Sequence, residues 1–111
     1  MSDDKQARIA ELNDAFRRTF VGGVVVQTAG VAALTSNQQA QLQIAVQTFD
    51  AFTDDNDPYG EHDFGQVKVD GQTVFFKLDY YSDQSLEYGS EDPSDPSQTT
   101  RVMTLMLAEE Y

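Results

Sequence analysis

The chain has no cysteine, no tryptophan, one histidine and only seven lysine or arginine residues against nineteen aspartate or glutamate residues. The missing cysteines exclude a disulfide scaffold, thiol catalysis and any thiolate metal site. The formal net charge of -12 argues against direct binding to nucleic acid or to an anionic membrane, since both need a basic surface. No hydrophobic run approaches the roughly 20 residues of a membrane span, and the acidic N-terminus is unlike a signal peptide. We therefore expect a soluble, cytoplasmic protein with no cofactor, folded as a single domain over residues 1–111.

The negative charge is confined to the second part of the chain. Residues 1–49 carry four acidic and four basic side chains and are neutral, whereas residues 50–111 carry 15 acidic side chains and three basic ones. The segments 50–63 and 79–95 hold six acidic residues each, and all five tyrosines lie in this part. A block of acids is most often a solvated loop. Acids interleaved with tyrosines also suit a protein-binding surface, and nearly as well the edge of a sheet.

Hydrophobic spacing predicts two helices. Residues 4–20 place an apolar side chain at every third or fourth position, and the pair Gly22-Gly23 is a suitable stop. A second helix is predicted from Ser36, which forms a capping-box pattern with Gln39, to about Phe52. The segment 29–34 between them is ambiguous between a turn and a short helix.

Four segments rich in β-branched and aromatic residues are predicted strands: 24–28, 64–69, 72–81 and 99–108. The pair Asp70-Gly71 is typical of a two-residue hairpin turn, which sets Val69 opposite Gln72. The core face of that hairpin is then Val67, Val69, Val74, Phe76 and Leu78. Residues 99–108 are apolar on both faces, so we expect a central strand. The order α-β-α-β-β-β predicts an α+β fold, with two helices packed on one face of a small, mainly antiparallel sheet.

The only histidine, His62, lies among acidic residues. A calcium loop read from Asp55 fails at its fifth and twelfth positions, where Tyr59 and Gln66 stand. Clustered carboxylates still leave open a divalent metal site, whose ligands would be Asp57, Glu61, His62 and Asp63. His62 is alternatively a general base oriented by Asp63 or Asp79. The plainer interpretation is that His62 binds backbone at the start of a strand.

From about Ile9 to Tyr111 the chain resembles an uncharacterised bacterial family, domain-of-unknown-function family 3768, which is found on plasmids and integrating elements. The residues that carry the resemblance are Leu12-Asn13-Asp14, Thr28 to Leu34, Asp55 to Pro58, Gly60 to Gly65, Lys77 to Tyr81, Gly89 to Pro93, Thr100-Arg101-Val102 and Tyr111. The chain departs from the family at Phe76, where many members are expected to have tryptophan. The resemblance implies no catalytic role. It implies a mobile-element setting, where acidic proteins that blunt restriction or CRISPR systems are common.

These observations lead to two hypotheses from different classes. The first is a non-enzymatic binding protein that engages a basic surface of a nucleic-acid-handling protein, for example as a nucleic-acid-mimicking inhibitor. Its predicted contact residues are Asp54, Asp55, Asp57, Tyr59, Glu61, Asp79, Tyr81, Asp83, Glu87, Tyr88, Glu91 and Asp92. The alternative is a metal-dependent hydrolase, whose predicted catalytic residues are His62, Asp63, Asp79 and Glu91. A structural or scaffolding partner of another mobile-element protein is a third interpretation, which the sequence does not separate from the first. The sequence predicts no particular oligomeric state.

Overall fold

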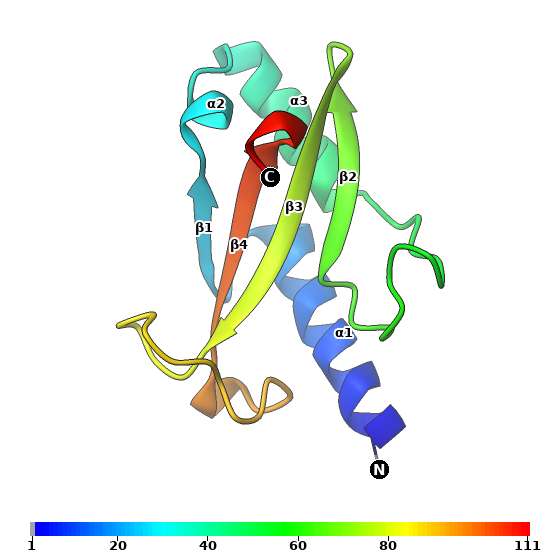
Figure 1. Ribbon diagram of the computed structural model, residues 1–111, viewed down its shortest axis with the longest axis vertical. Coiled ribbons are helices and arrows are strands. Elements are labelled where there is room, and N and C mark those ends of the chain that lie inside the picture. The colour runs from blue at the N-terminus through cyan, green and yellow to red at the C-terminus, as the bar shows by residue number, and fades with distance from the viewer. Residues whose placement is uncertain (1) are drawn as a thin grey trace.

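The molecule is a four-stranded sheet with helices on one face. The computed structural model describes residues 2–111, with side chains from Asp4 onward. Its helices and strands are α1 (Ser2–Thr19), β1 (Val24–Gln27), α2 (Ala29–Ala32), α3 (Ser36–Gln47), β2 (Phe64–Val69), β3 (Gln72–Tyr81) and β4 (Thr100–Leu107), with short 3-10 turns η1 (Pro96–Gln98) and η2 (Ala108–Glu110). The helices α1 and α3 lie on the same side of the sheet (Figure 1), which confirms the predicted α+β fold. No helix among these residues is long and apolar enough to cross a membrane.

The strands form one sheet in the order β1-β4-β3-β2. The β2–β3 hairpin has the predicted register, with Val69 opposite Gln72. The turn residues Asp70 and Gly71 have φ angles of 49° and 80°, the left-handed region that an Asp-Gly turn accommodates. Because β4 is antiparallel to β3 but parallel to β1, the sheet is mixed, and mainly antiparallel as predicted. β4 lies in the interior of the sheet, in agreement with its apolar character on both faces.

The hydrophobic core lies between this sheet and the two long helices. Phe16 of α1 and Leu42 and Val46 of α3 pack against Phe76 and Met103, and all five side chains are at most 2% exposed. The predicted core face of the hairpin is confirmed, with Val67 partly buried and the other four residues buried. Burial of such side chains supplies most of the driving force for folding.

The end of the second long helix differs from the prediction. α3 ends at Gln47 rather than near Phe52. The buried Arg17 guanidinium donates hydrogen bonds to Val46 O in the last turn of α3 at 3.0 Å and to Phe49 O just beyond the helix at 2.7 Å. Phe49 and Phe52 still pack against the core, so the apolar pattern reflects burial that continues beyond the helix.

The start of the same helix agrees with the prediction, since α3 begins at Ser36, but the capping residues are shifted by one position. The capping box is formed by Thr35 and Gln38 rather than by Ser36 and Gln39, because the same Ser/Thr-x-x-Gln pattern occurs twice in succession. The ambiguous segment 29–34 contains the short helix α2. Gly22, in the predicted stop after α1, has a φ of 107°, a conformation that glycine adopts without strain.

Candidate functional site

A buried polar network joins α1 to the two acidic segments. Asn13 is fully buried, and its Nδ2 donates to Glu61 O at 2.9 Å and to the Tyr80 hydroxyl at 2.8 Å. Its Oδ1 accepts a hydrogen bond of 2.7 Å from Arg101 Nε. The Tyr80 hydroxyl donates in turn to the Glu61 carboxylate at 2.9 Å, and burial raises the pKa of Tyr80, so the phenol keeps its proton. Arg101 also donates to Pro93 O, which fixes the second acidic segment to the same network.

The single histidine is held between two carboxylates. His62 Nδ1 lies 3.0 Å from both oxygens of Asp14, and Nε2 lies 3.7 Å from the Asp57 carboxylate. The imidazole stacks on the Phe52 ring, with 4.1 Å between ring centroids and planes 1° apart. Both ring nitrogens therefore face an acid of this chain, an arrangement that holds the ring in place rather than presenting a nitrogen to a substrate.

The backbone at His62 has an unusual conformation that Asp57 fixes. His62 has a φ of 58°, which is strained for a residue with a side chain. The Asp57 carboxylate accepts the N–H groups of Glu61 at 3.1 Å and His62 at 3.2 Å. Asp57 is predicted to contact a partner, but it is only 7% exposed. Its carboxylate binds the backbone of its own segment instead. The predicted orienting acids, Asp63 and Asp79, are replaced by Asp14, which lies 48 positions earlier in the sequence.

The residues of the predicted metal site are neighbours without forming a ligand set. Burial raises the pKa of Asp63, and the nearby negative charges of Glu61, Asp57 and Asp79 raise it further. Among the side chains that the structure describes, from Asp4 to Tyr111, no three histidine, aspartate or glutamate residues are placed so that they could hold a metal ion. The structure thus brings Asp63 and Asp79 into one electrostatic environment. Glu91 lies elsewhere, on a cavity lined also by Tyr88 and Gln98.

Arg17 is the second polar residue that α1 directs into the interior. Its guanidinium is buried, and besides the carbonyl groups of Val46 and Phe49 it binds Asp14 Oδ1 at 2.8 Å. It also lies over the rings of Phe52 and Phe76, at 5.3 and 5.8 Å from their centroids. Asp14 therefore links the buried arginine to His62, and the three side chains connect α1, α3 and the segment 50–63.

The two acidic segments lie at the same end of the sheet, and we call segments 50–63 and 79–95 together the acidic pole (Figure 1). Segment 50–63 leads into the start of β2, and segment 79–95 begins with the last residues of β3. Because β2 and β3 are antiparallel, the start of one lies beside the end of the other. The exposed predicted contact residues are Asp54, Asp55, Tyr59, Asp83, Glu87, Tyr88 and Glu91, and the half-buried ones are Glu61, Asp79, Tyr81 and Asp92. Tyr59 and Tyr88 are each 70% exposed.

Repeated Asp-x-Ser turns order the second acidic segment. Asp83, Asp92 and Asp95 each accept hydrogen bonds from the backbone N–H and the hydroxyl of the serine two positions later. These side-chain hydrogen bonds from serine lower the pKa of all three carboxyl groups, so they hold their negative charge below the usual range. The second acidic segment is thus a loop built from tight turns, and its charges have defined positions.

Comparison with known proteins places this site within a family. A family model described as a protein of unknown function, DUF3768, matches residues 27–110. The chain belongs to the DUF3768 family. No curated protein and no solved structure matches it. The family match includes the acidic pole, and within the network it includes Glu61, His62, Tyr80 and Arg101.

Sequence reasoning missed the side chains that α1 contributes. Asn13, Asp14 and Arg17 precede the part of the chain that the DUF3768 model matches. The available signal was their spacing: Asn13 and Arg17 are four positions apart and fall beside Phe16 and Phe20, on the face that a 3.6-residue period turns inward. Polar residues on an apolar stripe need buried partners, but no feature of the sequence shows which partners these are.

Proposed function

We propose that this DUF3768 protein is a non-enzymatic binding protein whose acidic pole engages a basic surface of a nucleic-acid-handling protein. The observation that carries the proposal is the convergence of both acidic segments at one end of the sheet, with exposed carboxylates and two exposed tyrosines. A concentration of like charge on one end of a small protein steers oppositely charged partners and accelerates their association.

The construction of the pole supports a binding role. The Asn13 network fixes one point in each segment, Glu61 in the first and, through Arg101, Pro93 in the second. The Asp-x-Ser turns order the rest of the second segment. Carboxylates with fixed positions lose little conformational entropy when a partner binds. The exposed Tyr59 and Tyr88 add rigid contact area that bears both an apolar ring and a hydroxyl.

Within this proposal, the carboxylates take the place of phosphates in a groove meant for DNA or RNA. An inhibitor of host defence, directed against a CRISPR or restriction system and encoded on a mobile element, would act in this way. The competing hypothesis, a metal-dependent hydrolase centred on His62, needs a ring nitrogen free to take a proton. The contacts of His62 with Asp14 and Asp57 favour a structural role instead.

The proposal is tested by affinity capture from a nuclease-treated bacterial lysate, with the tagged protein as bait, at low and high salt. Captured proteins should be basic nucleic-acid-binding proteins, a short DNA duplex should compete with the bait, and retention should fall steeply with salt. The pole variant Asp54→Asn/Glu91→Gln removes one exposed charge from each segment without touching a hydrogen bond of the fold. It should weaken binding of the captured protein by about tenfold.

A matched control removes two charges from the opposite end of the molecule. Asp70→Asn keeps the hairpin turn, since Asn-Gly is also favoured there, and Glu109→Gln changes an exposed position in η2. This double variant should bind like the unaltered protein. If the two double variants lose binding of the captured protein equally, or if salt does not change its retention on the bait, the acidic pole is not the contact surface.

A further inference from the structure

The strand β1 forms an open edge of the sheet. It pairs with β4 on one side only, and no helix or strand formed by residues 2–111 lies along its other side (Figure 1). Thr28 donates its N–H to Leu105 O at 3.0 Å. Because successive residues of a strand direct their backbone groups to alternate sides, the N–H and C=O groups of Val25 and Gln27 point away from β4. These groups are the donors and acceptors that a further strand would use.

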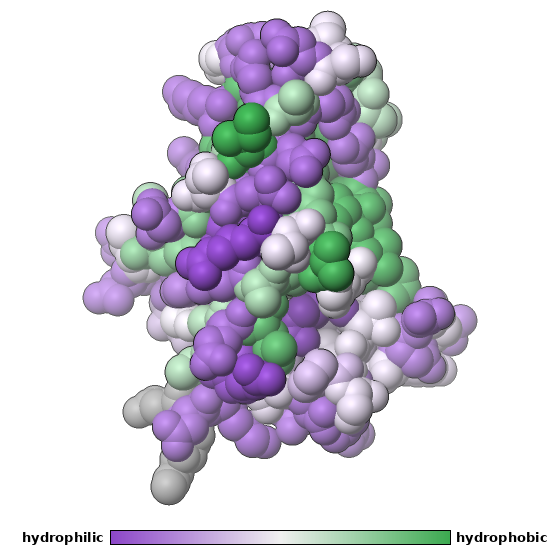
Figure 2. Space-filling model, turned by 180° about the vertical axis from the view of Figure 1, so that it is seen from behind, coloured by the Kyte–Doolittle hydropathy of each residue, from purple (hydrophilic) through white to green (hydrophobic). Residues whose placement is uncertain are grey.

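This edge is unusually apolar. Val24 and Val26 are 41% and 40% exposed, and Val21 just before the strand is 73% exposed. Figure 2 shows the molecule from behind, with the side of β1 on the right, and hydrophobic residues gather on that side. Exposed edges in soluble proteins are usually protected by lysine, proline or a bulge, yet β1 consists of three valines and a glutamine. An unprotected apolar edge of this kind is suited to pairing with another chain.

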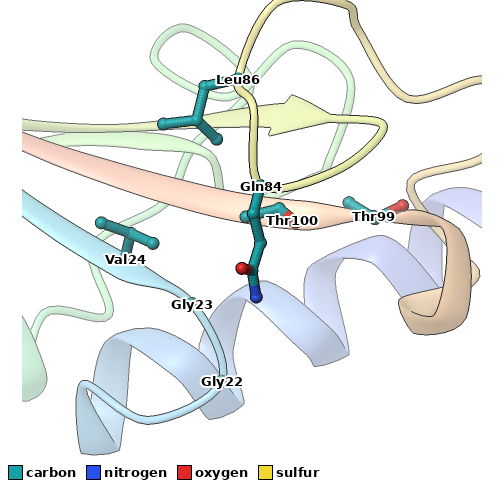
Figure 3. Close-up of a pocket in the computed structure, with 7 residues that line it drawn as sticks. All are labelled: Gly22, Gly23, Val24, Gln84, Leu86, Thr99 and Thr100. Carbon is teal, nitrogen blue, oxygen red and sulfur yellow. The ribbon is translucent and has the colours of Figure 1, made fainter.

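A cavity of about 540 Å³ lies at the N-terminal end of this edge. Its walls come from the chain at the start of β1, from the loop after β3 and from the chain at the start of β4; they are Gly22, Gly23, Val24, Gln84, Leu86, Thr99 and Thr100. In Figure 3 the side chains of Val24 and Leu86 point from opposite sides into the same space. Leu86 holds this position with a φ of 58°, a strained conformation for leucine.

We propose that the free edge of β1 binds an extended peptide segment of a partner protein as a fifth strand. The main chain of the peptide pairs with the outward N–H and C=O groups of Val25 and Gln27, and one apolar side chain of the peptide fills the cavity between Val24 and Leu86. This is strand addition with a side-chain pocket, in which backbone pairing gives affinity and the pocket gives specificity. The site shares Leu86 and its neighbouring acids with the acidic pole, but it goes beyond the proposed function because its backbone contacts lie on β1, outside the pole.

Charge identifies the partner as a basic peptide rather than a second copy of this chain. The exposed acids Asp83 and Glu87 flank the residues that line the cavity. Edge-to-edge pairing of two copies would bring these acids against either the same acids or Glu109 and Glu110 at the other end of the edge. Each copy carries a net charge of -12, and like charges at a contact oppose association. A lysine or arginine next to the apolar anchor meets those acids favourably.

The inference is tested by selecting binders from a phage-displayed library of random linear peptides on the immobilised full-length protein. Selected peptides should alternate apolar and polar residues and carry lysine or arginine beside one apolar position. The variant Val25→Pro removes an outward N–H, and proline is tolerated at an edge-strand position whose N–H faces solvent. It should weaken binding of the selected peptides by at least about tenfold.

A second variant keeps the test independent of any damage to β1. Leu86→Gly removes one wall of the cavity and places glycine where the φ angle favours it, so the fold is retained. It should also weaken binding of the selected peptides by about tenfold. The control Ile44→Ser, at an exposed apolar residue of α3, should leave their binding unchanged. The inference is overturned if no peptide is enriched, if the enriched peptides bind both variants normally, or if the protein forms a dimer that Val25→Pro dissociates. Loss of peptide binding in Asp54→Asn/Glu91→Gln would instead place the peptides at Asp54 or Glu91 rather than at β1.

Discussion

Replacing Asn13 tests whether the buried network organises the molecule. Asn13→Ala removes three hydrogen bonds at once, two donated by Nδ2 and one accepted by Oδ1, at a fully buried position. The Tyr80 hydroxyl keeps its bond to the Glu61 carboxylate. The Glu61 carbonyl and the Arg101 Nε lose the partner that Asn13 provides.

The loss of stability follows from these contacts. A hydrogen bond between neutral groups contributes about 1 kcal/mol and one with a charged group about 2 kcal/mol, so the three bonds together amount to roughly 4 kcal/mol. Alanine favours the helix by about 0.5 kcal/mol more than asparagine and offsets a small part of the loss. The expected change is therefore about 3–4 kcal/mol, a large share of the roughly 5–15 kcal/mol that stabilises an ordinary domain.

Urea denaturation followed by circular dichroism measures this change. The matched control is Asn37→Ala, at an exposed residue of α3, which gains the same helix propensity without losing a buried contact. Hydrogen exchange should also show faster exchange in segments 50–63 and 79–95 of the Asn13 variant. If the two asparagine variants differ by less than about 1 kcal/mol, the network does not hold the acidic pole.

Three further changes probe other contacts of the structure. Arg17→Lys should lower the free energy of unfolding by roughly 3 kcal/mol in urea, since an ammonium group cannot reproduce the fork of bonds to α3 and Asp14. Gly65→Ala should cost about 1–3 kcal/mol in the same assay, because the added Cβ would lie 2.5 Å from the Phe76 ring. Burial raises the pKa of Asp63, so its contribution to stability is present below the usual aspartate pKa and is lost as pH rises through the raised pKa. The free energy of unfolding of Asp63→Asn should therefore exceed that of the unaltered protein by more at pH 7 than at pH 3. Denaturation curves that give the same difference between the two proteins at both pH values would contradict this.

Much of the fold could be predicted because it depends on local patterns. The Asp70-Gly71 turn fixes the register of β2 and β3, since only a few residue pairs accept the φ angles of a two-residue turn. The apolar run of β4 predicted its interior place in the sheet. The apolar pattern predicts an end of α3 near Phe52, beyond its actual end at Gln47, because Phe49 and Phe52 continue that pattern. Arg17, some 30 positions away, binds the carbonyl groups of Val46 and Phe49, which a longer helix would use for its own hydrogen bonds.

The sequence alone determined that this protein is an acidic α+β domain with its excess charge after Phe49, because charge and hydrophobic period are properties of neighbouring residues. The tertiary structure alone decided what each of those charges does. It brings Asp14 to His62 across 48 positions, buries Asp57 as a cap, and leaves β1 with an open apolar edge. The reason is physical: a carboxylate becomes a cap, an ion pair or a contact residue through the groups within about 4 Å of it, and those groups come from distant parts of the chain.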